Sequence, residues 1–499
     1  MSDTTLFVIV LLLLLIGPLW YARRRSTTLA GYFISDRSLG GVVSAFAYSS
    51  AAVSAGLFLG GAGFAYVYGW AGATYQLGAL VGILLAWILI APRVRKMAAS
   101  VGALSTPRFL AERFECPALR TITSALTVIF VLPMVIVQFR GAGLLFENFL
   151  GLDYTWSVIA FGLLVGFFTA LGGNSAVSYL DTIQGSIMII GSIVCVVVGL
   201  SDVGGLHNLN VQLARIDMDL VRFVGDVPRP IWWNLLIIFG FAQFSNPHLI
   251  PRFFSLRDSR AIRWALPLSV SINCLWVCAA VLIGLVTRVN HSGLASGDEA
   301  MPVFLQSLSP VMSFVILLAL LSAIFSTTDS LLLTAGTNVA HDIVKGVFWP
   351  ELSERGELWL AKWSMFILCG ICFTLSLLDL PLITLMNSFA MGAFVLIFGL
   401  PLALGIFSRR ATKEAALVAV IAGPIIYLGW KYWLVPLTGI GEMIASLLIL
   451  IPAMILVSMV TEPNSTSCLE RFQLLPKRKL GTAGAPFSSD GASALPRRP

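Results

Sequence analysis

The chain has 499 residues, of which 58% are hydrophobic and only 11% are charged, and its formal net charge is +7. Soluble domains carry about 25% charged residues, so the composition excludes an ordinary soluble protein. Apolar runs long enough to cross a bilayer recur from end to end, which predicts an all-α polytopic membrane protein. The seven cysteines and four histidines are scattered, and the sequence has no P-loop, HExxH or GxSxG motif, so nothing in it indicates an enzyme.

Hydropathy predicts about thirteen membrane-spanning helices. The first, Thr5–Tyr21, follows Asp3 and precedes three arginines, which favours a retained helix with its N-terminus outside over a cleaved signal peptide. The remaining spans are expected at 40–66, 71–92, 121–147, 154–172, 178–200, 231–250, 262–288, 309–338, 361–380, 383–407, 414–435 and 440–461.

The placement of basic residues agrees with this topology. With the N-terminus outside and the C-terminus inside, 26 of the 32 lysine and arginine residues fall on the inner side and five on the outer side, as the positive-inside rule requires. Orientation and lipid contact thus explain the basic charge, and no nucleic-acid partner is expected. We expect a transmembrane domain over 1–461, with an amphipathic helix around Val211–Val224 in its longest outer loop, and a disordered cytoplasmic tail over 462–499.

Two spans are expected to be interrupted. The second reads FAYSSAAVSAGLFLGGAGFAYVYG and is rich in serine and glycine, and the seventh reads IIFGFAQFSNPHLIPRFF, where Pro247 removes a backbone donor. The second and seventh spans are five apart in the count of helices. Because each successive span crosses the membrane in the opposite direction, an odd spacing gives these two spans opposite topology. Paired interrupted helices in two inverted halves point to a transport site at the membrane midplane. The alternative is that the glycines serve close helix packing, since Gly56-xxx-Gly60 is also an association pattern.

The ninth span contains the run LSAIFSTTDSLLLTAGTN, which places hydroxyls and a carboxylate in mid-membrane. Ala323, Ser326, Thr327 and Ser330 follow i, i+3, i+4, i+7 and share one helix stripe. Such a stripe offers oxygen atoms, which suit a small, hard cation. The alternative is that the hydroxyls bond to their own helix or join two helices.

Three stretches together resemble the sodium/solute symporter family: LSAIFSTTDSLLL in the ninth span, GGNSAVSYLDTIQGSIM at Gly172–Met188, and SNPHLIPRF at Ser245–Phe253. The resemblance covers roughly residues 5–460. It implies the leucine-transporter-type fold, with two inverted five-helix repeats, here about 40–200 and 231–407, plus peripheral helices. Within the family the chain most resembles the sodium/pantothenate and sodium/proline branch, and VQFRGAGLLFENFLGLDY and GGAGFAYVYG are similar to the pantothenate type.

Two departures from that branch lie near the expected solute pocket. Where the pantothenate type has small hydroxyl residues before the double glycine, this chain has Gly56 and Leu57. Where the proline type has an aspartate in the unwound segment, this chain has Ala52. Neither substrate therefore carries over from the resemblance.

The resemblance implies a sodium site of backbone carbonyls and two hydroxyls, which fall here on Ser50, Val53, Ala323, Ser326 and Thr327. This set agrees with the oxygen stripe of the ninth span, and about five neutral oxygens can replace the waters of a small cation. Asp181 and Asp329 are expected on the ion pathway. For Asp181 the alternative is an acid at a helix N-terminus, where the helix dipole favours it.

Solute-contacting residues are expected between the two interruptions, at Gly56, Leu57, Gln138, Arg140, Phe239, Gln243 and Asn246. Arg140 is the basic residue left inside a span, and a buried arginine would favour a carboxylate by bidentate pairing. The alternatives for Arg140 are snorkelling to the outer interface or pairing with Glu147.

The sequence thus predicts a multi-pass cell-membrane protein that imports a small organic solute with Na⁺ by alternating access, with no organic cofactor. The expected solute carries a carboxylate and is pantothenate-, proline- or monocarboxylate-like. One alternative is proton coupling in the same fold, with Asp181 or Asp329 as the carrier. Another is a transporter-like sensor, although such proteins usually append a signalling domain and the expected tail has 38 residues.

Overall fold

The structure is a computed structural model that describes Gly17, Trp20, and residues 28–378 and 383–475. The predicted first span, Thr5–Tyr21, lies almost entirely outside the described residues. Every named element within them is a helix. Leu39 and Leu256 form an isolated backbone bridge.

The first half of the chain runs from the short α2 to the long α10. Its elements are α2 (Leu29–Ile34), η1 (Ser35–Arg37), α3 (Gly41–Ala52), α4 (Ala55–Tyr68), α5 (Ala71–Thr74), α6 (Gln76–Leu85), η2 (Ala86–Ile90), α7 (Ala91–Ser100), α8 (Thr106–Phe114), α9 (Pro117–Leu150) and α10 (Tyr154–Asp202).

The second half continues from α11 to α23. Its elements are α11 (Leu206–Ile216), η3 (Met218–Val221), α12 (Arg229–Ala242), α13 (Ile250–Phe254), α14 (Ser259–Asn290), η4 (Gly297–Glu299), α15 (Ala300–Gln306), α16 (Pro310–Thr337), η5 (Asn338–Phe348), α17 (Glu354–Ser376), α18 (Ile383–Phe394), η6 (Val395–Gly399), α19 (Leu400–Phe407), α20 (Lys413–Gly429), η7 (Trp430–Leu434), α21 (Val435–Thr438), α22 (Glu442–Val460) and α23 (Thr466–Arg471).

Within the described part of the chain, nine helices are long and apolar enough to cross a membrane, or ten if the bent pair α3 and α4 is one span. The predicted count of about thirteen is larger for three reasons. The first predicted span is not described, α12 is too short to count alone, and α10 merges two predicted spans. In α10 the chain kinks at Gly173, with φ 59° and ψ −170°, where a Cβ would lie 2.6 Å from the ring of Tyr32. A single glycine thus replaces the five-residue connection expected between 172 and 178.

Both predicted interruptions are present. After α3, Val53 and Ser54 are extended, with φ −106° and −132°, and α4 leaves at an angle of 53°. After α12, residues 243–249 form turns before α13 begins. The first interruption therefore places non-helical backbone inside one bent span, and the second places it between α12 and α13.

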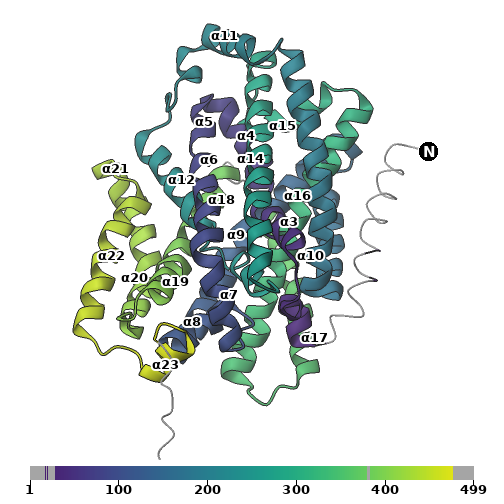
Figure 1. Ribbon diagram of the computed structural model, residues 1–499. Coiled ribbons are helices and arrows are strands. Elements are labelled where there is room, and N and C mark those ends of the chain that lie inside the picture. The colour runs from purple at the N-terminus through teal and green to yellow at the C-terminus, as the bar shows by residue number, and fades with distance from the viewer. Residues whose placement is uncertain (1–16, 18–19, 21–27, 379–382, 476–499) are drawn as a thin grey trace, which may run out of the picture.

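The bent pair α3 and α4 lies in the middle of the view, whereas α12 lies toward α20 and α22 (Figure 1). Helices α3, α4, α14 and α16 occupy the middle of the view, with α20 and α22 on one flank and α10 and α17 on the other. Glycines allow the closest contacts: a Cβ at Gly284 of α14 would lie 2.1 Å from the carbonyl oxygen of Ala62 on α4. Helix α11 lies at one end of the bundle and α8 and α23 lie at the opposite end.

Two sequence-based expectations outside the core need correction. The amphipathic helix expected around Val211–Val224 is α11, which begins and ends earlier. The predicted disorder of the tail is wrong for residues 462–475, because α23 forms and packs on α8. The Phe472 ring lies 5.6 Å from that of Phe109, and Asn464 Nδ2 donates to the Arg113 carbonyl at 2.8 Å.

Candidate functional site

A cluster of oxygen atoms forms where α3 ends against the middle of α16. The end of a helix leaves carbonyl groups without intrahelical partners. Ser326 Oγ donates to the Ser50 carbonyl at 3.0 Å and lies 3.1 Å from the Ala323 carbonyl. Thr327 Oγ1 lies 3.0 Å from the Val53 carbonyl and 3.3 Å from that of Ser50. The structure therefore brings together all five residues of the predicted sodium set.

This five-oxygen cluster, Ser50 O, Val53 O, Ala323 O, Ser326 Oγ and Thr327 Oγ1, is shielded from solvent. None of the five residues is more than 3% exposed. All five oxygens are neutral, and neutral oxygens at this spacing fit a small, hard cation better than a soft metal. Ser50 Oγ in turn donates to the Asp181 carbonyl at 3.1 Å, which ties the cluster to α10.

A buried ion pair lies next to the five-oxygen cluster. Arg252 of α13 lies 3.1 Å from Asp181 Oδ2, and both side chains are at most 2% exposed. Arg252 also donates to Ser178 Oγ at 2.9 Å and to Ser330 Oγ. Asp329 accepts from Ser330 Oγ at 3.2 Å. Sequence analysis missed Arg252, although it stands within SNPHLIPRF as a basic residue just after the second interruption.

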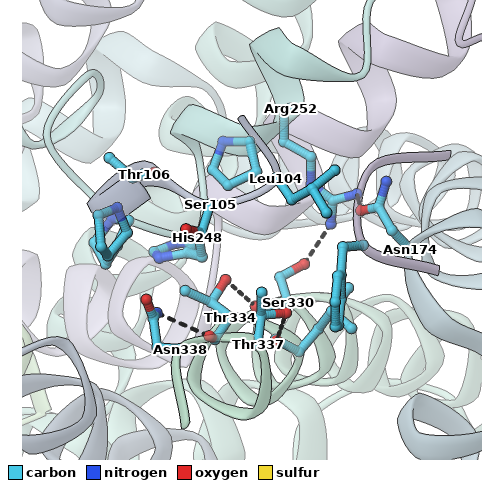
Figure 2. Close-up of a pocket in the computed structure, with 15 residues that line it drawn as sticks. Leu104, Ser105, Thr106, Asn174, His248, Arg252, Ser330, Thr334, Thr337 and Asn338 are labelled. Carbon is cyan, nitrogen blue, oxygen red and sulfur yellow. Dashed lines mark hydrogen bonds between the residues drawn. The ribbon is translucent and has the colours of Figure 1, made fainter. Parts of the chain in front are cut away.

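An inner cavity lies between α8, α13 and the C-terminal half of α16 (Figure 2). Figure 2 shows Arg252 reaching toward Ser330, with Thr334 and Asn338 on the same helix opposite His248. The cavity measures about 20 Å³, which is room for one water molecule. It joins the ion pair to the end of the molecule that carries α8.

A central cavity lies between the two interruptions. It is also about 20 Å³ and is lined by Ala52, Val53, Ser54, Leu57, Gln76, Ala79, Leu80, Ile83, Phe239, Gln243, Asn273, Val277, Asn387 and Met391. Three predicted solute residues, Leu57, Phe239 and Gln243, are among them. The polar groups are carboxamides and one hydroxyl, and none of the lining side chains is charged.

Gln76, Asn273 and Asn387 were missed by sequence analysis. They come from α6, α14 and α18, three helices that contain no interruption at these positions. A carboxamide in mid-membrane was the available signal, because polar side chains there are rare and usually face the protein interior.

Four predicted solute residues do not line the central cavity. Gly56 packs behind it, since a Cβ there would lie 2.6 Å from Asn387 Nδ2. Gln138 Oε1 accepts from the Ala55 N–H at 3.0 Å. Asn246 is 1% exposed, and neither of its amide atoms has a partner among the described residues.

The fourth of these residues, Arg140, lies beside η4 and not at the central cavity. Its Nη2 is 3.8 Å from Asp298 Oδ2, and the same carboxylate oxygen accepts from the Ile383 N–H at 3.2 Å. Burial raises the pKa of Asp298, while the Ile383 N–H and Arg140 oppose that shift. The expected pairing of Arg140 with a solute in the central cavity therefore does not fit this arrangement.

Comparison with known proteins agrees with the geometry. Residues 32–423 match the model of the sodium:solute symporter family. The chain is 27% identical over 475 residues to the osmoregulated proline transporter OpuE of Bacillus subtilis (strain 168), covering 93% of this chain and 96% of that protein. It is 26% identical over 455 residues to the sodium/pantothenate symporter of Escherichia coli (strain K12), covering 90% and 94%.

Solved structures give the same fold. The chain is similar to a substrate-bound, outward-open Na⁺-coupled sialic acid symporter, with a TM-score of 0.77, 19% identity, and coverage of 92% of this chain and 98% of that one. It is also similar to inward-facing Mhp1, with a TM-score of 0.52, 14% identity, and coverage of 88% and 95%. These relatives are transporters and not enzymes. The family match spans most of the sequence, so the chain belongs to the sodium:solute symporter family.

Proposed function

We propose that the protein is a Na⁺-coupled symporter of the cell membrane that imports a small organic solute. Na⁺ binds at the five-oxygen cluster of Ser50, Val53, Ala323, Ser326 and Thr327. The observation that carries the proposal is the convergence of carbonyls from the α3–α4 interruption on two buried hydroxyls of α16, at 3.0 Å each. An arriving ion replaces these hydroxyl–carbonyl hydrogen bonds with ion–oxygen contacts.

The solute binds in the central cavity, against Leu57, Phe239 and Gln243. A cavity of about 20 Å³ holds one water molecule, so solute binding requires the helices around it to move apart. Val53 contributes to both sites, since its carbonyl belongs to the five-oxygen cluster and the residue also lines the cavity. Coupling follows if Na⁺ orders this shared segment, because each ligand then favours binding of the other.

Release toward the cell interior passes Asp181 and Asp329 into the inner cavity. The pair of Asp181 with Arg252 lies between the five-oxygen cluster and that cavity. An inward Na⁺ gradient and a negative interior both favour import, with each charge gaining about 2.3 kcal/mol per 100 mV.

We propose a carboxylate-bearing solute of the proline or pantothenate kind. This rests on the relatives named as proline transporters and sodium/pantothenate symporters. The carboxamides of Gln76 and Gln243 line the cavity and each keep one N–H group that can donate to such a solute. Arg140 is not needed for this role.

Proton coupling is a second candidate, and one observation favours it. Asp329 Oδ2 is buried without a hydrogen-bond partner among the described residues, and burying such a carboxyl costs less when it is protonated and uncharged. In that case uptake would follow a pH gradient and persist when Na⁺ is replaced by choline.

The test is uptake of labelled L-proline, pantothenate and small monocarboxylates into liposomes that contain the purified protein. We expect accumulation with an inward Na⁺ gradient, none with choline, and none for the double variant Ser326→Ala, Thr327→Ala. Na⁺-driven accumulation by the double variant equal to wild type would refute the sodium site.

A further inference from the structure

The first turn of α4 has its backbone N–H groups held by two side chains. A helix start leaves such groups without intrahelical partners. Ser54 Oγ accepts from the Gly56 N–H at 3.0 Å, and Gln138 Oε1 accepts from the Ala55 N–H at 3.0 Å. Ser54 is the ordinary N-cap of α4, whereas Gln138 reaches across from α9. This second contact fixes where α4 begins relative to α9.

Gln138 is itself held in place. It is fully buried, and its Nε2 donates to the Met134 carbonyl at 3.2 Å, so its oxygen is directed at Ala55. Three residues further along the same face of α9, Gly141 leaves space for the contact. A Cβ there would lie 2.8 Å from the Cβ of Ala55. Two separate features of α9 are therefore built around Ala55.

Ala55 follows Val53 by two residues, and Thr327 contacts the Val53 carbonyl at 3.0 Å. The interruption is thus held through its carbonyls by α16 and through its N–H group by α9. We propose that Gln138 is a positioning residue of the sodium site: by holding Ala55, it keeps the Val53 carbonyl aimed at the ion. This inference rests on the proposed function, because it requires the five-oxygen cluster to bind Na⁺.

The chemistry of Gln138 suggests a pair of informative variants. Gln138→Met keeps the length of the side chain and removes the acceptor. Groups that orient metal ligands without touching the metal change its affinity about tenfold when removed, so we expect the half-saturating Na⁺ concentration to rise about tenfold. Gln138→Glu retains a carbonyl oxygen that can accept from Ala55, and it should recover most of that loss.

The probe is Na⁺ alone, added to the purified full-length protein in detergent at constant ionic strength with choline chloride. Tryptophan fluorescence and the melting temperature report binding. The matched control is Thr127→Val, also buried on α9, whose hydroxyl donates to the Thr123 carbonyl of its own helix at 2.7 Å. It should lower the melting temperature without moving the half-saturating Na⁺ concentration.

If Gln138→Met does not fold, Gly141→Ala tests the same contact, because its methyl group must displace Ala55. A wild-type half-saturating Na⁺ concentration in the folded variant would overturn the inference, even if the melting temperature fell. In that case Gln138 would serve stability alone. A wild-type protein with no saturable response to Na⁺ would instead overturn the proposed function, so the two failures are distinguishable.

Discussion

The two interrupted helices differ in how their polar groups are held. At the α3–α4 interruption, Ser326 and Thr327 contact the carbonyls, and Ser54 and Gln138 accept from the N–H groups. At the α12–α13 interruption, Tyr48 donates to the Gln243 carbonyl at 2.7 Å. There, however, both amide atoms of Asn246 and the Nδ1 of His248 are buried without partners among the described residues.

The polar groups of the first interruption are thus already paired, whereas some of those of the second interruption are not. A buried polar group without a partner costs about 1–3 kcal/mol, and a rearrangement or an arriving ligand can satisfy it. At the first interruption the carbonyl and N–H groups already have partners within the protein. The second holds buried polar groups, on Asn246 and His248, that still lack partners among the described residues.

The largest effect on either interruption is expected at Arg252, which holds α13, the helix after the second interruption, through its pair with Asp181. Arg252→Gln leaves Asp181 buried without its cation. Removing one partner of a buried ion pair costs about 3–5 kcal/mol, and we expect a loss of this size in SDS-induced unfolding.

The double variant Arg252→Gln, Asp181→Asn should lose less unfolding free energy than Arg252→Gln alone, because no carboxylate then remains buried without a cation beside position 252. Equal losses in the single and double variants would mean that the pair of charges is not what holds α13.

A smaller effect is expected at the first interruption from removing one hydroxyl. Thr327→Val keeps the shape of the side chain and removes the oxygen that contacts Val53. The half-saturating Na⁺ concentration should rise about tenfold, equivalent to about 1.4 kcal/mol, as measured by tryptophan fluorescence. Thr328→Val is the control, since among the described residues the Thr328 hydroxyl donates to the Ile324 carbonyl of its own helix, at 2.6 Å. Equal shifts in both variants would argue against the assigned ligand.

The second interruption offers the opposite test, because removing a polar group there should stabilise the protein. Asn246→Leu replaces an unpartnered amide by an apolar group of similar size, and we expect a gain of about 1 kcal/mol in the free energy of unfolding. Asn273→Leu should destabilise, since the amide of Asn273 donates to Ser49 Oγ at 2.9 Å and to the Ser269 carbonyl at 2.8 Å. A loss in both variants would show that Asn246 is satisfied in solution.

The five-oxygen cluster could be predicted because its signal is local. Ser326 and Thr327 stand on one helical stripe, and serine and glycine mark the unwound segment before α4. The resemblance then supplied the carbonyls of Ser50 and Val53, and the structure brings all of these residues together.

The central cavity could not be predicted to the same degree, because its walls come from helices distant in sequence. Gln76, Asn273 and Asn387 meet only after packing, and no spacing along the chain relates them. Gln138 and Arg140 show that even neighbouring residues could not be assigned to one site from the sequence. They are two residues apart on α9 and therefore point to different sides of the helix, one to Ala55 and the other to Asp298.

The smallest expected effect concerns Asp298, which lies beside the C-terminal half of α4. The loop carrying it packs on α4, where a Cβ at Gly63 would lie 2.7 Å from the Gly297 carbonyl. Burial raises the pKa of Asp298, so the folded protein keeps this proton at a higher pH than the unfolded chain does. Its contribution to stability is therefore present at low pH and falls as pH rises through the folded-state pKa.

Asp298→Asn removes this dependence. The melting temperature of the variant relative to wild type should rise as pH increases above about 4, the usual carboxyl range, and should level off above the folded-state pKa, since the wild type then carries the cost of a buried charge that asparagine lacks. Glu299→Gln, the neighbouring carboxylate, controls for loss of charge in this loop. A relative melting temperature that falls with pH would mean that Arg140 and the Ile383 N–H outweigh burial and stabilise the charged form of Asp298.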